Sequence, residues 1–179
     1  MPDAKNKLFL YEALELRAEF AARIKTLKDC LPEAKQNRSR FSFVREEEGK
    51  YRPGPDFNIV ETRDQFRKLE IKYRKLNSAI QQANFQHQIH FREDTINLSE
   101  ALEIRKGLNE QIGEFHTQVV NSAYQRVIYK EDRDIVEPNE LSYTECVKNL
   151  EESRLAFREL NRKIRAASFE VVVDFQEEQ

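Results

Sequence analysis

The chain has 179 residues, of which 35% are charged, and its 30 Lys and Arg residues nearly balance its 32 Asp and Glu residues. It contains only 4 Gly, 5 Pro and no Trp, a composition that suits long helices with solvated faces better than a turn-rich β-sandwich. The formal net charge of −2 offers no general attraction to nucleic acid or to an anionic membrane surface. We therefore expect no nucleic-acid partner.

No apolar run in the sequence approaches the roughly 18 residues that a membrane-spanning helix requires. The N-terminal stretch MPDAKNKLFL has neither the long apolar core nor the small-residue cleavage site of a signal peptide. Cys30 and Cys146 lie far apart and neither belongs to a CxxC pair, so we expect two reduced, packed thiols. These features predict a cytoplasmic protein with no membrane span.

The first and third expected helices, about residues 8–31 and 98–120, carry the same stripe. Its members follow one another at alternating spacings of 3 and 4, which is typical of a coiled-coil seam. Each member of the first stripe has a counterpart 88 residues later, and LYEALELR in the first segment matches LSEALEIR in the third. The stripes are Leu10, Ala13, Arg17, Phe20, Ile24, Leu27 and Leu31, and Leu98, Ala101, Arg105, Leu108, Ile112, Phe115 and Val119.

The second and fourth expected helices, about residues 62–84 and 143–168, also repeat one another, at an offset of 84. The shared residues are Arg74, Leu76, Asn77, Ile80, Ala83, Phe85 and Phe91, with Arg158, Leu160, Asn161, Ile164, Ala167, Phe169 and Phe175 as counterparts. Capping boxes are expected where a side-chain acceptor precedes an acid or amide by three residues. The pairs are Thr62 with Gln65, Asn97 with Glu100, and Ser142 with Glu145.

The hydrophobic period changes from about 3.6 to 2 directly after the second and fourth helices. Residues 85–91 and 169–175 alternate apolar and polar side chains, which predicts one half-buried strand in each repeat. These strands would pair with each other or leave an edge open to another chain. Segments 40–55 and 126–138 are β-rich, carry charged tips and end in proline, as expected for hairpins between helices.

Together these patterns predict a mainly α fold with small β elements, in which a helix-hairpin-helix-strand unit is internally duplicated. One amphipathic helical pair cannot bury its stripe alone, whereas a second copy packed against it would complete a core. We therefore expect a single domain over residues 1–179, made of repeats at about 8–91 and 96–175 and related by a pseudo-twofold axis. The expected architecture is a four-helix, coiled-coil-like antiparallel bundle.

Four motifs, in order along the chain, carry a resemblance to a known family. They are EALELRAEFAARIKTL in the first helix, IQQAN ending the second, EALEIR opening the third, and LAFRELNRKIR in the fourth. In order and spacing, over about residues 8–169, these motifs resemble the septicolysin-like family of small, uncharacterised bacterial helical proteins. The resemblance implies a bacterial protein, and the family name implies a membrane-active, toxin-like activity as one alternative.

Two arginines and two asparagines occupy matched positions in or beside the stripes: Arg17 and Arg105, and Asn77 and Asn161. A buried guanidinium is costly unless it is paired, so each arginine should meet a carboxylate or a backbone carbonyl, or extend to solvent along its aliphatic stem. An interior asparagine commonly fixes helix register. The four side chains could form one polar layer in the core or, as the functional alternative, an anion-binding pocket at the repeat interface.

The remaining residues predict no catalytic, cofactor or metal site. A strand places His87 and His90 on opposite faces, so we expect a packed His87 and an exposed His90, and no shared metal ion. The basic run within residues 63–75 is interspersed with acids and is typical of a solvated helix face. No nucleophile with its base, Gly-rich phosphate loop or paired carboxylates stands out, so an enzyme is the less favoured interpretation.

The sequence favours a non-enzymatic, self-associating scaffold or interaction protein, expected as a homo-oligomer with no specified further protein partner. Edge strands and aromatic hairpins offer surfaces that a monomer does not need. The hairpin aromatics are Phe41, Phe43, Tyr51, Tyr124 and Tyr129. Two alternatives stay open: a membrane-active septicolysin-like toxin, and an anion-binding or enzymatic pocket around the arginine pair.

Overall fold

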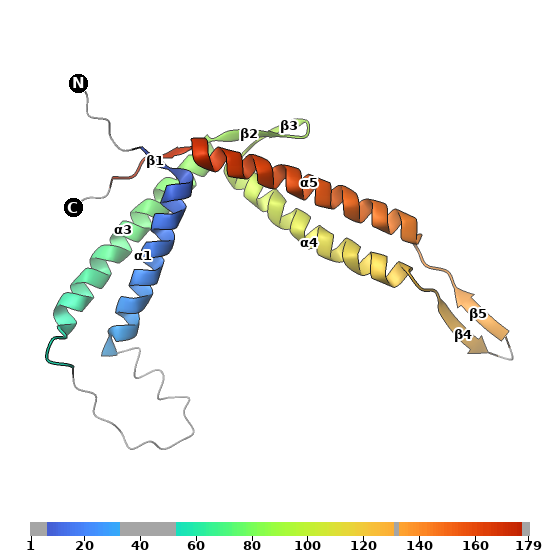
Figure 1. Cartoon of the computed structure of the whole chain (residues 1–179), viewed down its shortest axis with the longest axis horizontal. Helices are drawn as coiled ribbons and strands as arrows, with labels where there is room; N and C mark the ends of the chain where they lie inside the picture. The colour runs from blue at the N-terminus through green and yellow to red at the C-terminus, as the bar shows by residue number, and fades with distance from the viewer. Residues whose placement is uncertain (1–6, 33–52, 131–132, 177–179) are drawn as a thin grey trace, which may run out of the picture. The chain divides into compact units, whose positions relative to one another are not determined.

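The computed structural model describes residues 7–32, 53–130 and 133–176. The described chain is mainly helical, with three small antiparallel strand pairs (Figure 1). Its helices are α1 (Leu10–Cys30), α3 (Ile59–Gln86), α4 (Leu98–Ser122) and α5 (Tyr143–Glu170). Its strands are β1 (Leu8–Phe9), β2 (Gln88–Phe91), β3 (Asp94–Asn97), β4 (Arg126–Lys130), β5 (Arg133–Glu137) and β6 (Val172–Val173). The predicted mainly α class with small β elements is confirmed.

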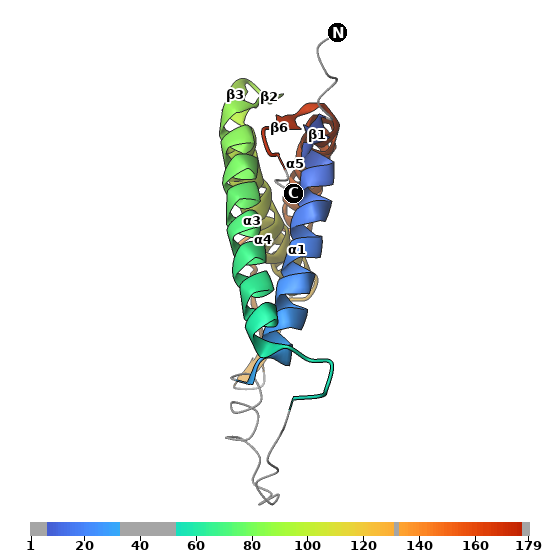
Figure 2. The same cartoon turned by 90° about the vertical axis from the view of Figure 1, so that its left-hand side faces the viewer.

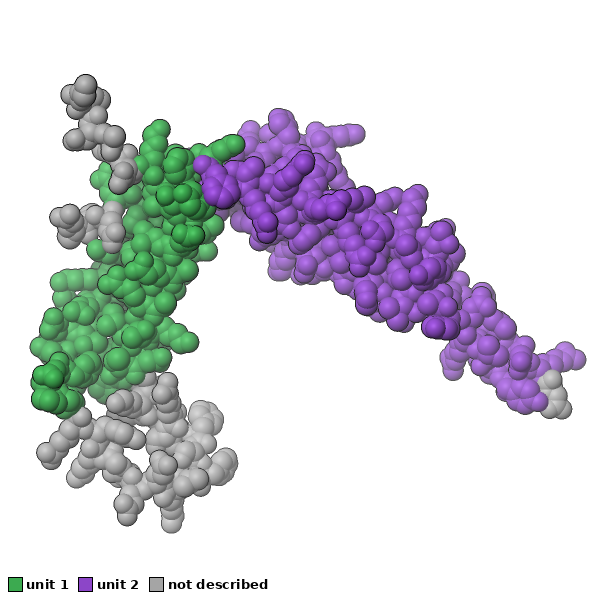
Figure 3. Space-filling model, in the orientation of Figure 1, with its two compact units in different colours: residues 1–83, 170–179 green, residues 84–169 purple. Residues whose placement is uncertain are grey.

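The chain divides into two compact units (Figure 3), and each unit is built on one pair of helices. The first unit comprises residues 1–83 and 170–179 and holds α1, most of α3, β1 and β6. The second comprises residues 84–169 and holds α4, nearly all of α5, and strands β2 to β5. Both α3 and α5 continue across a boundary between the units.

In the first unit, α1 and α3 lie side by side and run antiparallel (Figures 1 and 2). The predicted stripe of α1 and the repeated apolar residues of α3 supply the core of this helical hairpin, in which Phe20, Leu76 and Ile80 are almost completely buried. Farther along α1, Ile24 and Leu27 are only half-buried. In a pair of helices, each helix covers only one side of the other's apolar stripe. The other side of the stripe stays accessible to solvent or to a partner.

In the second unit, α4 and α5 form the corresponding antiparallel hairpin (Figure 1). Ser153 Oγ on α5 donates a hydrogen bond to Gln111 Oε1 on α4 at 3.3 Å, and Leu160 is fully buried. Of the predicted α4 stripe, only Leu98 and Ala101 are buried. The half-buried members are Arg105, Leu108, Ile112, Phe115 and Val119. Most of this stripe is therefore open to further packing.

Two short strand pairs stand immediately before α1 and α4. β1 pairs with β6, and β2 pairs with β3, both antiparallel. Leu8 opposes Val173 in the first pair, and Ile96 opposes Ile89 in the second. These two oppositions are equivalent at the sequence offsets of 88 and 84, because 8 + 88 = 96 and 173 − 84 = 89.

The hydrogen bonds beside the two strand pairs correspond in the same way. Leu10 N donates to Val171 O at 2.8 Å, and Leu98 N donates to His87 O at 3.0 Å. Each bond satisfies an N–H group in the first turn of a helix, where no intrahelical acceptor is available. The residue just before β2 thus anchors the start of α4, and the residue just before β6 anchors the start of α1.

The strands predicted at residues 85–91 and 169–175 are longer than the observed strands. Phe85 and Phe169 lie in the last turns of α3 and α5 and are 62% and 61% exposed, so their assignment to strands is wrong. No Gly or Pro lies before either strand to end the helix. The helices therefore continue almost to the first paired strand residue, which is residue 88 after α3 and residue 172 after α5. The two strands do not pair with each other, since each has its own partner.

Two of the three predicted helix caps are confirmed. Asn97 Oδ1 accepts a hydrogen bond from Glu100 N at 2.9 Å at the start of α4. At the start of α5, Ser142 N and Ser142 Oγ donate to Glu145 Oε2 at 3.1 and 2.7 Å, and Glu145 N donates to Ser142 Oγ at 3.3 Å. The bond from the Ser142 hydroxyl, with that from its backbone, lowers the pKa of the Glu145 carboxyl.

The third cap is at Asn58, and the prediction of Thr62 is wrong. Asn58 Oδ1 accepts from Val60 N at 3.0 Å and from Glu61 N at 3.2 Å, so α3 begins at Ile59. Thr62 lies one turn inside the helix, where its hydroxyl donates to Asn58 O at 2.8 Å. Asn is a stronger cap than Thr, and it sits four residues earlier in the chain.

The hairpin predicted at residues 126–138 is confirmed by β4 and β5, which pair antiparallel from Arg126 opposite Glu137 to Lys130 opposite Arg133. The hairpin predicted at 40–55 lies outside the described residues apart from 53–55, and it stays a prediction.

Candidate functional site

Arg17 and Asn77 meet across the α1–α3 hairpin. Arg17 Nη1 donates to Asn77 Oδ1 at 3.1 Å, and both side chains are half-buried. Arg17 is directed toward α3 because it shares a helical face with the buried Ala13 and Phe20. The partner is an amide oxygen, not the predicted carboxylate or backbone carbonyl. Two of the four polar residues singled out in the sequence are therefore in direct contact.

Arg105 and Asn161 lie in the second unit, on α4 and α5, and both are half-buried. The described residues show no hydrogen bond between them that corresponds to the bond from Arg17 to Asn77. Asn161 therefore keeps its amide donors and its carbonyl acceptor for other partners. The layer of four polar residues, and the anion pocket built from them, stay predictions.

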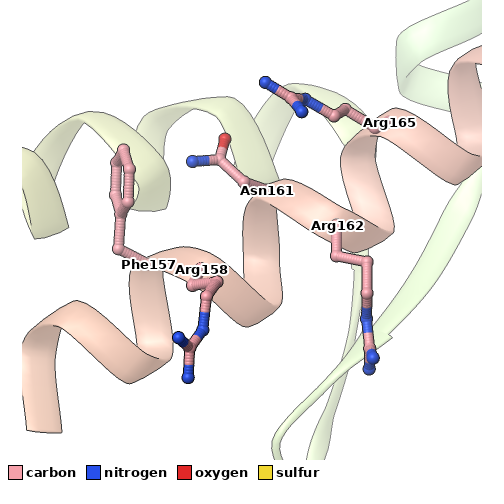
Figure 4. Close-up of a pocket in the computed structure, with 5 residues that line it drawn as sticks. All are labelled: Phe157, Arg158, Asn161, Arg162 and Arg165. Atoms are coloured by element: carbon pink, nitrogen blue, oxygen red, sulfur yellow. The ribbon is translucent and has the colours of Figure 1, made fainter.

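A hollow of about 310 Å³ lies on α5, lined by Phe157, Arg158, Asn161, Arg162 and Arg165 (Figure 4). We refer to it as the α5 hollow. The five residues follow a helical spacing that places them along one face. Phe157 and Asn161 are half-buried, and the three arginines are exposed. Among the described residues, no carboxylate lines this hollow, which gives it a locally positive field.

The nearest acids along α5 are paired with cations outside the α5 hollow. Glu151 Oε1 lies 2.7 Å from Arg154 Nη1, and Glu159 Oε1 lies 2.8 Å from Lys163 Nζ. The hydrogen bond from Lys163 is the main reason why the pKa of the Glu159 carboxyl is lowered, with a smaller contribution from Arg162. Lys163 Nζ also donates to His90 O at 2.6 Å. The carboxylates near the hollow are thus largely neutralised by other side chains.

The β4–β5 hairpin presents apolar side chains on both of its faces. Cross-strand partners share a face, so Val127, Val136 and Tyr129 lie on one face, while Ile128 and Ile135 lie on the other. Val127, Val136 and Tyr129 are 56%, 48% and 70% exposed. Every residue of β4 and β5 is exposed except the half-buried Ile128. A two-stranded hairpin in this state is marginally stable in water.

Apolar side chains are also exposed at equivalent positions of α3 and α5. Ile71 and Leu155, 84 residues apart, are 45% and 53% exposed. Phe85 and Phe169 form the second such pair at the ends of the same helices. The corresponding helices therefore carry matched apolar surfaces outside the stripes that form the hairpin cores.

Among the described residues, the histidines and cysteines are not grouped into a common site. His90 is exposed and its Nδ1 lies 2.8 Å from Thr95 Oγ1, whereas His87 is half-buried. Cys146 is buried as predicted, but Cys30, the last residue of α1, is exposed, so the prediction that it is packed is wrong. In the described ranges, no group of three or more His, Cys, Asp or Glu side chains is placed to hold a metal ion. None of the described helices is long and apolar enough to cross a membrane.

Two surfaces were missed by reasoning from the sequence, although signals for both are present. Arg162 and Arg165 stand 84 residues after Ser78 and Gln81, a difference in charge that a comparison of the apolar stripes does not consider. The pairing of Ile71 with Leu155 is visible at the offset of 84, but helix periodicity alone directs attention to the buried stripe.

The chain matches no protein-family model and no curated protein. It is similar to a solved structure, described as the crystal structure of a functionally unknown conserved protein from Corynebacterium diphtheriae. That match has a TM-score of 0.62 and 20% sequence identity, and it covers 94% of this chain and 100% of the other. At this identity the likeness concerns the fold alone. The septicolysin-like resemblance stays a prediction from the sequence.

Proposed function

We propose that this protein is a non-enzymatic scaffold that associates with further copies of itself. The observation that carries the proposal is the β4–β5 hairpin, because it exposes apolar side chains on both faces. Monomeric proteins seldom expose large contiguous apolar patches, and such patches commonly mark interaction surfaces. An isolated two-stranded hairpin also leaves unpaired N–H and C=O groups along both edges, to which another chain can add.

The matched apolar positions on α3 and α5 support the same proposal. Ile71 and Leu155, with Phe85 and Phe169, give both helical hairpins a comparable surface for a partner. A second copy exposes the same apolar side chains, so the two copies can bury these side chains against each other. Contacts between identical patches are self-complementary and close readily into symmetric assemblies.

The internal duplication and the four-helix bundle belong to this proposal. The equivalent register of the two strand pairs, and the equivalent bonds to Leu10 N and Leu98 N, support a duplicated unit. The half-buried stripe of α4 supports further helix packing. We propose that each helical hairpin completes an antiparallel four-helix arrangement with a hairpin of a second copy.

Sedimentation velocity of the full chain at about 20 µM tests the proposal. The variant replaces Val127, Tyr129 and Val136 with Thr, which keeps strand propensity while removing apolar surface. Wild-type protein should sediment as a multiple of 21.3 kDa. The triple variant should associate at least about a hundredfold more weakly, because every lost side chain is removed from each copy at the interface.

The matched control replaces Lys130 and Arg133 with Thr on the same hairpin. These two residues oppose one another across the strands and contribute no apolar face. The control should assemble like the wild type, and far-ultraviolet circular dichroism should show that all three proteins are folded. A monomeric wild type would refute self-association, and equal assembly of the triple variant would exclude this hairpin as the interface.

A further inference from the structure

The α5 hollow has the composition of an anion site, independent of self-association. It is lined by three arginines and one asparagine on neighbouring turns of α5, and it has no carboxylate among its lining residues. We propose that it binds a small ligand with two or more linked phosphate groups, an oligophosphate, through Arg158, Arg162, Arg165 and Asn161.

The charge of the α5 hollow is available to a ligand. Its three arginines are exposed, and no ion pair engages them within 4.0 Å in the described part of the chain. Neighbouring acids are held by Arg154 and Lys163, which line no part of the hollow. Unneutralised arginines on a surface cost little, but they provide charge-assisted donors that a bound anion can use at once.

The first repeat provides an internal comparison. Positions equivalent to the α5 hollow are Tyr73, Arg74, Asn77, Ser78 and Gln81. There the amide of Asn77 already accepts from Arg17, and Ser78 and Gln81 carry no charge. In the second repeat, no such donor reaches the equivalent amide from the described residues, and two additional guanidinium groups flank it. The stripe that packs the helix is retained, so the added charge is not required for helix packing.

The directions of the side chains favour a ligand with more than one anionic group. In Figure 4, Arg158 and Arg162 extend to one side of α5, and Phe157 and Arg165 extend to the other, with the Asn161 amide between them. A single small anion would not reach all three guanidinium groups. A chain of linked phosphates is longer and offers several anionic groups, each of which the planar guanidinium fork can bind in a bidentate manner.

The test is isothermal titration calorimetry of the full chain with sodium tripolyphosphate at low ionic strength. The binding variant is Arg162→Ser with Arg165→Gln, which installs the residues of the first repeat at the same positions. The control is Lys148→Gln with Arg154→Gln, which removes two positive charges from the same helix outside the α5 hollow. We expect the binding variant to lose affinity by about a hundredfold, about tenfold per arginine, and the control to change by less than about threefold.

Titration with magnesium-free ATP distinguishes a plain phosphate chain from the phosphate chain of a nucleotide. Affinity equal to that of tripolyphosphate indicates recognition of the phosphate chain alone, and tighter binding indicates that a nucleoside is recognised as well. The proposal is overturned if tripolyphosphate fails to bind the wild type at millimolar concentration. It is also overturned if the control variant loses as much affinity as the binding variant, since that would be a non-specific charge effect.

Discussion

At the scale of single residues, Arg17 is paired with the amide of Asn77, while Glu12, five residues earlier in the same helix, is bonded to other groups. Glu12 accepts from Phe9 N at 2.9 Å and from Tyr11 Oη at 3.1 Å at the start of α1. The first of these bonds satisfies a backbone donor ahead of the helix, so Glu12 acts in capping. Arg17 instead donates to Asn77, 3.1 Å away on α3.

Replacement of Arg17 by Met should lower the free energy of unfolding by about 1 kcal/mol, because a half-buried amide oxygen loses its donor. Arg105→Met is the matched control at the equivalent position of α4. It should change stability by less than about 0.5 kcal/mol, since no bond to Asn161 is lost. Urea unfolding followed by circular dichroism measures both. Equal losses would show that the contact with Asn77 contributes nothing specific.

The capping box at α5 predicts a pH dependence. Because its hydrogen bonds from Ser142 lower the pKa of Glu145, the box contributes stability above the ordinary carboxyl pKa, and this contribution is lost as the pH falls through the lowered value. Ser142→Ala should therefore lower the melting temperature more at pH 7 than at pH 3. Thermal unfolding of the wild type and variant across this range measures the difference.

Asn97→Ala serves as the control for this pH effect. Asn97 also caps a helix, but it accepts from a backbone N–H group and does not titrate. Its melting-temperature deficit should stay nearly constant from pH 7 to pH 3, apart from the general destabilisation that both proteins share. A Ser142→Ala deficit that is equally constant would contradict the role assigned to Glu145.

At the scale of elements, the helices were predictable and the exact strand boundaries were not. Apolar residues at alternating spacings of 3 and 4 define one buried helix face, and those stripes supply Phe20, Leu76 and Leu160 to the hairpin cores. Alternation of apolar and polar residues over only seven positions is a weaker indication of where a helix ends and a strand begins. Phe85 and Phe169 suit the last turn of a helix as well as a strand, and strand pairing with β3 or β1 decides the boundary.

The pairing of strand β6 with strand β1 can be tested directly. Val173 opposes Leu8 and is 2% exposed, whereas the adjacent Val172 is 45% exposed. Val173→Ala should cost about 2 kcal/mol through lost burial and the cavity that remains. Val172→Ala should cost less than about 0.5 kcal/mol, because the same side chain is removed from the solvent side.

Chemical denaturation of the two valine variants measures this difference. Ile89→Ala in strand β2 extends the test to the equivalent junction, because Ile89 opposes Ile96 as Val173 opposes Leu8. It should also destabilise the protein by at least about 2 kcal/mol. If Val172→Ala proved as damaging as Val173→Ala, the register of the β1–β6 pair would be wrong.

At the scale of the whole molecule, the stripes predicted which faces are buried but not what covers them. Hydrophobic burial is non-directional, so a stripe on α4 packs equally well against a helix of the same chain or of another copy. The polar residues at matched positions likewise do not reveal from the sequence which side chains they contact. Arg17 and Asn77 could be singled out by their place in or beside the stripes. The arginines around Asn161 could not, because Arg162 and Arg165 differ from the residues 84 positions earlier.

At 20% identity, a similar fold over 94% of the chain is found in the conserved Corynebacterium diphtheriae protein. In our account, the exposed β4–β5 hairpin and the matched positions on α3 and α5 then serve assembly.

Native mass spectrometry of the wild-type chain at about 20 µM tests the central claim of self-association most directly. A dominant species at an integer multiple of 21.3 kDa is the predicted result, and its number of copies would define the assembly. A single species at 21.3 kDa under the same gentle conditions would contradict the account.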